Sequence, residues 1–93
     1  MRIIGEIPHD FLKITVFKMN EKLSIKFEHD LLEQIIKFRE GSAVNDLESA
    51  KAFVNLNLNQ LVISNMEKLS VFRGEQLHHM NNQNEGTGFP EII

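Results

Sequence analysis

The side chains best suited to chemistry in this sequence are its four histidines, because imidazole can bind a metal ion or transfer a proton near neutral pH. His9 and His29 both precede an aspartate, and the strand register inferred below places them roughly 10 Å apart, too far to share one metal ion. His78 and His79 are adjacent, so on a helix they point about 100° apart. Glu75 and His79 could contact one ion, but two ligands make a weak site. We therefore predict turn and surface histidines, and no metal or cofactor.

No other pattern indicates an enzyme. The chain has no cysteine, tyrosine or tryptophan, and it lacks a glycine-rich phosphate loop. Ser24, Ser42, Ser64 and Ser70 lack the strand-to-helix context of a nucleophile elbow. We expect a protein without catalytic activity.

Length and composition indicate one small domain. The chain has 93 residues, of which 42% are hydrophobic and 25% charged, as in soluble globular proteins. The net charge of −3 is too small to indicate a charged partner. The lack of cysteine excludes disulfides and fits a cytoplasmic location. No apolar run approaches the ~20 residues of a membrane span, so we expect no membrane partner. We predict a single domain at 1–80 and a polar tail with an apolar tip at 81–93.

The elements that position these side chains begin with a hairpin. Apolar and polar residues alternate over 11–19 and again over 22–28, the pattern of half-buried strands. A two-residue turn at 20–21 brings the apolar sets onto one face and pairs Lys13 with Glu28 on the other. A slip of one residue would break both patterns. Residues 1–6 could add a short first strand.

Residues 31–40 allow two interpretations. In a helix, Asp30 is the N-cap and Glu33 completes a capping box. In a third strand, 29–30 is the turn, Glu33 lies opposite Lys26, and Gln34 faces the core. The pattern alone leaves both open.

Two helices are expected after Gly41. Asn45 is a suitable N-cap for the first. The second begins near Leu58 and ends at Gly74 or Met80, with apolar residues at helical spacing. A competing interpretation is a second hairpin over 61–73, since the sequence EKLSI at 21–25 recurs as EKLSV at 67–71.

Four segments of the first forty residues resemble a group of short uncharacterised bacterial proteins: Ile4-Gly5-Glu6-Ile7-Pro8-His9, Lys13-Ile14-Thr15-Val16-Phe17, Lys26-Phe27-Glu28 and Leu32-Glu33-Gln34. In that group, the segment matching 33–39 has the character of a strand followed by helices. The resemblance therefore favours a strand at 31–40. It implies no activity, cofactor or partner.

Together these features predict an α+β fold, an antiparallel three- to four-stranded meander packed on two C-terminal helices. The predicted core residues are Leu12, Ile14, Val16, Leu23, Ile25, Phe27, Ile36, Leu61, Val62 and Leu69.

The outer face of this sheet is the predicted functional surface. Its exposed apolar residues, with the apolar tip of the tail, form the predicted partner surface: Phe17, Met19, Ile35, Phe89 and Ile92. We expect self-association as a homodimer, or binding to another protein, because a small domain has little core of its own. The alternative is nucleic-acid binding by the basic residues of the same face, which are Lys13, Lys22, Lys26, Lys37 and Arg39.

Overall fold

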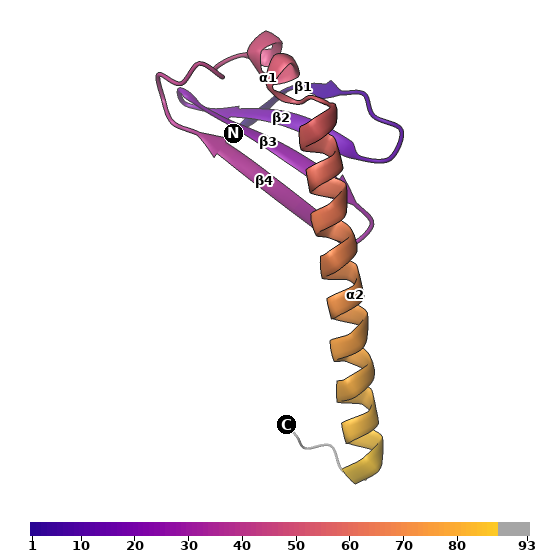
Figure 1. Cartoon of the computed structure of the whole chain (residues 1–93). Coiled ribbons are helices and arrows are strands. Elements are labelled where there is room, and N and C mark those ends of the chain that lie inside the picture. Colours follow the sequence, from indigo (N-terminus) through magenta and orange to yellow (C-terminus); the bar gives the residue numbers. More distant parts are fainter. Residues whose placement is uncertain (88–93) are drawn as a thin grey trace.

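Four consecutive strands form an antiparallel sheet in which each strand pairs with the next along the chain (Figure 1). They are β1 (Arg2–Ile7), β2 (Lys13–Met19), β3 (Lys22–His29) and β4 (Leu32–Phe38). A computed structural model describes the backbone of residues 1–87 and the side chains of residues 1–82. The predicted α+β meander is confirmed, with four strands.

Both hairpin turns contain two residues and begin with a residue in the left-handed region. Asn20 has φ 58° and Asp30 has φ 56°, a conformation that asparagine and aspartate adopt more readily than other non-glycine residues. The predicted β2–β3 register is confirmed, with Lys13 opposite Glu28.

Residues 32–38 form a strand, so the helix considered there is wrong. The predicted register of this strand is also wrong. The turn is 30–31 rather than 29–30, because Asp30 takes the left-handed position that Asn20 takes in the preceding hairpin. Glu33 therefore lies opposite Glu28, and Ile35 lies opposite Lys26. Gln34 faces inward as that interpretation required, and its amide Nε2 donates to the Val62 carbonyl at 3.1 Å.

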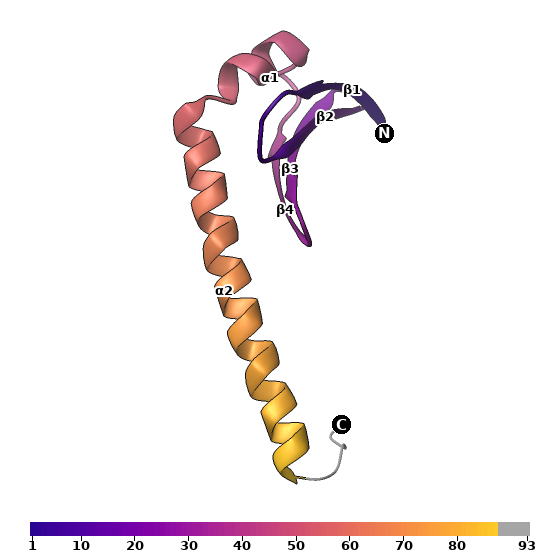
Figure 2. The ribbon, with the colours of Figure 1, turned by 90° about the vertical axis from the view of Figure 1, so that its right-hand side faces the viewer.

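Two helices lie on one face of the sheet, and no other described element covers its opposite face (Figure 2). The first, α1 (Leu47–Phe53), is capped by Asp46 rather than by the predicted Asn45, since Asp46 accepts a hydrogen bond from the Ser49 amide at 2.8 Å. The second, α2 (Leu56–Thr87), is continuous through Gly74. The second hairpin considered at 61–73 is therefore wrong.

The core lies between the inner face of the sheet and the two helices. Its buried apolar residues are Leu12, Ile14, Val16, Leu23, Ile25, Phe27, Ala50, Val54, Val62 and Met66. Ile36 is half-buried and packs against this core. Leu61 and Leu69 were predicted in the core but are 57% and 48% exposed. The sheet covers only one side of α2, and that side carries Val62 and Met66.

The chain is elongated because α2 extends far past the sheet (Figure 1). The molecule measures 55 × 27 × 17 Å and has a radius of gyration of 18.1 Å, whereas a compact domain of this length has about 12 Å. The helix includes the first seven residues of the predicted tail, 81–87. Phe89 and Ile92 lie outside the described residues. Among the described helices, none combines the length and hydropathy needed to cross a bilayer.

Candidate interaction surfaces

The outer face of the sheet is organised around Lys26. Its ammonium lies 3.4 Å from the Glu28 carboxylate and 5.1 Å from the centre of the Phe17 ring. These contacts form a cation–π pair and an ion pair on the open face. Lys26 is therefore engaged by its own sheet, and it leaves Phe17 only partly exposed.

The predicted apolar residues of this face do not form one patch. Phe17 lies in β2 and Ile35 in β4, separated by Ser24 and Lys26 of the intervening strand. Met19 is 50% exposed and stands at the end of β2 beside the turn. Ile3, which is not among the predicted surface residues, lies opposite Phe17 and is 61% exposed. Ile3 and Phe17 are therefore cross-strand neighbours, whereas Ile35 is separated from them by the polar residues of β3.

The five predicted basic residues are also divided. Lys22, Lys37 and Arg39 are exposed and line a shallow depression at one end of the sheet, together with Glu40. Lys13 is at the other end, opposite Glu28. Only three of the five basic residues are therefore grouped.

A second surface, absent from the sequence predictions, is the part of α2 that extends past the sheet. We call residues 74–87 the overhang. Every side chain from Gly74 to Asn82 is exposed, including Leu77 at 51% and Met80 at 54%. An isolated helix of this length is marginal in water. The overhang is thus a helix whose apolar side chains have no cover within the described part of the chain.

The apolar exposure continues into the middle of α2, on the side away from the sheet. Val71 is 61% exposed and Phe72 is 58% exposed. They line a shallow groove flanked by Glu67, Lys68 and Glu75. We call the four residues Lys68, Val71, Phe72 and Glu75 the central cluster. It combines an apolar centre with one charge of each sign.

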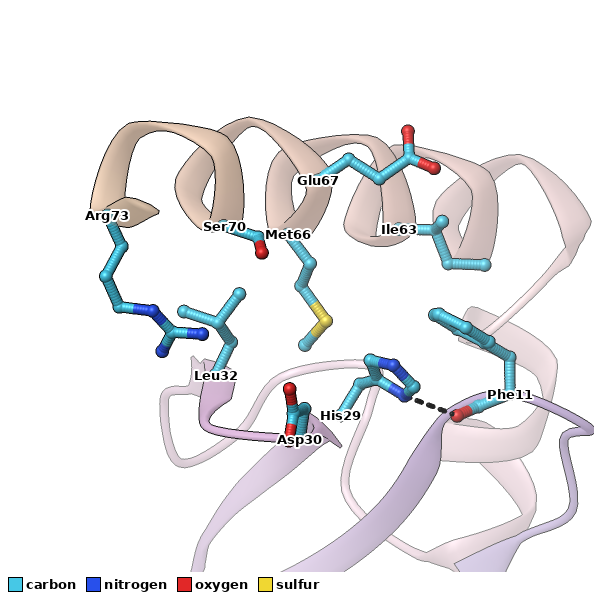
Figure 3. Close-up of a pocket in the computed structure, with 9 residues that line it drawn as sticks. All are labelled: Phe11, His29, Asp30, Leu32, Ile63, Met66, Glu67, Ser70 and Arg73. Atoms are coloured by element: carbon cyan, nitrogen blue, oxygen red, sulfur yellow. Dashed lines mark hydrogen bonds between the residues drawn. The ribbon is translucent and has the colours of Figure 1, made fainter. Parts of the chain in front are cut away.

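A cavity of about 170 Å³ lies between α2 and the β3–β4 turn (Figure 3). The Phe11 and His29 rings stack at one side with their centres 3.8 Å apart, and the His29 Nδ1 lies 3.2 Å from the Phe11 carbonyl oxygen. At the other side, the Arg73 guanidinium donates to the Leu31 carbonyl at 3.4 Å. Pockets for small-molecule ligands usually hold about 300–1,000 Å³. The Arg73 contact connects the helix to the turn, the His29 contact connects β3 to the segment before β2, and the cavity is smaller than such a site.

The histidines make local contacts. The His9 Nδ1 accepts hydrogen bonds from the Phe11 and Leu12 amides, both at 3.0 Å, and so closes the β1–β2 connection. The His78 Nε2 lies 3.0 Å from the Asn82 side-chain nitrogen, one helical turn away. Across the described residues, no three histidine or acidic side chains converge as metal ligands would.

Comparison of the chain with protein-family models, curated proteins and solved structures found no match. The resemblance of residues 4–40 therefore stays a prediction, and the function must be inferred from the geometry described above.

Proposed function

We propose that the protein is a small non-catalytic interaction protein that joins a second copy of itself through α2. The observation that supports this most is the free side of α2, which carries Val71 and Phe72 at 61% and 58% exposure. Covering these side chains would contribute about 25 cal/mol per Å² of apolar area removed from water. We place this activity in the cytoplasm, the location predicted from the cysteine-free composition.

A second copy is the partner that the charges of α2 favour. Lys68 and Glu75 flank the apolar centre of the helix with opposite charges, and Glu67 adds a second acid at the rim of the groove. A surface carrying one charge of each sign can match a copy of itself. An unrelated protein would need an acidic group opposite Lys68 and a basic group opposite Glu75.

The oligomeric state tests this proposal. We expect sedimentation velocity of the full chain from about 5 to 500 μM to show a monomer–dimer equilibrium, as is typical of a small interface. Phe72→Glu should shift the protein to monomer, because it places a charge in the apolar centre of the cluster. The matched control is Ile35→Glu, which introduces the same charge at a 47% exposed position on the outer sheet face. This control should dimerise as the parent does.

Two outcomes would contradict the proposal. A protein that stays monomeric at 500 μM does not self-associate over the concentrations tested, which would contradict the proposed dimer. Dimers lost in Ile35→Glu but kept in Phe72→Glu would assign the interface to the sheet.

Nucleic-acid binding is the second candidate, favoured by the grouping of Lys22, Lys37 and Arg39 at one end of the sheet. It has less support, because Lys26 is paired with Glu28 and Glu33 lies on the same face. Fluorescence anisotropy with a labelled single-stranded oligonucleotide would detect it. Binding that weakens steeply with salt, and that Lys37→Glu removes, would favour this candidate over self-association.

A further inference from the structure

Building on the proposed self-association, we infer that two copies pair their α2 helices antiparallel, crossing between Val71 and Phe72. In this arrangement, Lys68 of each copy faces Glu75 of the other.

The free side of α2 supports this orientation. At 100° per residue, Lys68 and Glu75 lie on nearly the same side of the helix, roughly opposite the buried Val62 and Met66. Figure 2 shows that the sheet covers only one side of α2. A second helix could therefore lie along the other side without meeting the sheet of the first copy.

The spacing of the central cluster is symmetric. Lys68 lies three residues before Val71, and Glu75 lies three residues after Phe72. A twofold axis between Val71 and Phe72 exchanges residue 68 with residue 75, so each copy contributes one cation and one anion to two identical contacts. In a parallel pair, Lys68 would meet Lys68 and Glu75 would meet Glu75, and like charges repel.

The same axis gives the longest overlap. The point between Val71 and Phe72 is the midpoint of α2 (Leu56–Thr87). An antiparallel pair centred there aligns all 32 residues, about 48 Å of helix. A stable interface needs about 800 Å² per partner, and no other register offers as much helix surface. It also sets the helix of each overhang beside the first half of the other copy's α2, while Leu77 and Met80 stay on the side of α2 that carries Val62 and Met66.

Exchanging the two charges tests the register. Residues 68 and 75 are seven apart, about 10 Å along one helix, too far to pair within one chain. Lys68→Glu or Glu75→Lys alone should weaken dimerisation about tenfold at low salt, since each creates two like-charge contacts. The double exchange should restore the parent affinity. The control is Lys37→Glu, which makes the same change of charge on the sheet and should leave dimerisation unchanged.

Cross-linking gives a direct measurement of orientation, and the cysteine-free chain makes it simple. The same twofold axis places Ser64 of one copy opposite His79 of the other. An equimolar mixture of Ser64→Cys and His79→Cys chains, treated with a short bismaleimide, should give a 64–79 cross-link. Neither variant alone should cross-link.

The outcomes separate this inference from the proposed function. Dimers that are indifferent to both single exchanges, or that cross-link 64 to 64 and 79 to 79, would overturn the antiparallel register while leaving self-association intact. A monomeric parent chain would overturn both.

Discussion

Gly5 lies where β1 packs closely against α1. It pairs with Val16 and faces α1, where a Cβ atom added to it would lie 2.7 Å from the Leu47 Cδ2. Side-chain atoms do not pack at that distance, so the leucine would have to move. The absence of a side chain at this position allows Leu47 to seat α1 against β1.

Two glycine substitutions should therefore have opposite effects on stability. Gly5→Ala should lower the free energy of unfolding by about 1–3 kcal/mol, the usual cost of overpacking. Gly74→Ala is the matched control, since its added Cβ would meet nothing within 4 Å. It should raise helix stability by about 1 kcal/mol. Urea denaturation followed by circular dichroism would measure both, and equal destabilisation by the two variants would contradict this account.

Single residues also explain one success and one failure of the sequence predictions. The inward position of Gln34 weakened the strand interpretation because a buried amide needs a hydrogen-bond partner. Its partner is the Val62 carbonyl, 28 residues away on α2, which no local pattern reveals. The turn at Asp30 was misplaced by one residue because both His29-Asp30 and Asp30-Leu31 satisfy the alternation of the flanking strands.

At the scale of elements, the start of α1 depends on a reciprocal capping box. The Ser49 amide donates to the Asp46 carboxylate at 2.8 Å, and the Ser49 hydroxyl donates to the same oxygen at 2.7 Å. In return, the Ser49 oxygen accepts from the Asp46 amide at 3.0 Å. The backbone hydrogen bond from Ser49, with its side-chain hydrogen bond next, lowers the pKa of Asp46 below its ordinary value of 3.8.

This shift predicts the pH dependence of the cap. A carboxyl with a lowered folded-state pKa stabilises the fold fully above its unfolded value of 3.8, and that contribution is lost as the pH falls through the lower folded-state value. Asp46→Asn should therefore melt at a lower temperature than the parent at pH 7. The difference should shrink as the pH falls below 3.8. Thermal melts from pH 2 to pH 7 would test this, and a constant difference would show that the charge has no role.

The elements differed in how far local patterns could predict them. The β2–β3 hairpin was predicted in full because apolar alternation and the Lys13–Glu28 pair agree on a single register. The length of α2 was not, because Gly74 and the amide-rich residues after it normally end a helix or weaken it. The exposure of the Leu61 and Leu69 side chains could not be predicted either, since it depends on which side of α2 meets the sheet.

At the scale of the whole molecule, the sheet and the overhang have different sources of stability. The sheet closes its own core with α1 and the first half of α2. Within the described chain the overhang has its backbone hydrogen bonds and the local His78–Asn82 contact, and its residues from Gly74 to Asn82 are all exposed. The partner surface predicted from the sequence lies on the sheet, because the alternation of apolar residues is visible in the strand segments. The extended shape that exposes the helix is a property of the whole fold.

This division predicts a concentration dependence of hydrogen exchange. Amides of residues 74–82 should exchange rapidly in dilute protein, because a short uncovered helix opens readily. Their protection should rise at least about tenfold in dimer-forming concentrations, since bound helices must separate before opening. Amides of β2 and β3 should show no change and serve as the internal control. Hydrogen exchange read by mass spectrometry at 5 and 500 μM would measure both regions. Equal protection of 74–82 at the two concentrations, in a sample shown to dimerise, would mean that the overhang lies outside the interface and that the copies meet elsewhere.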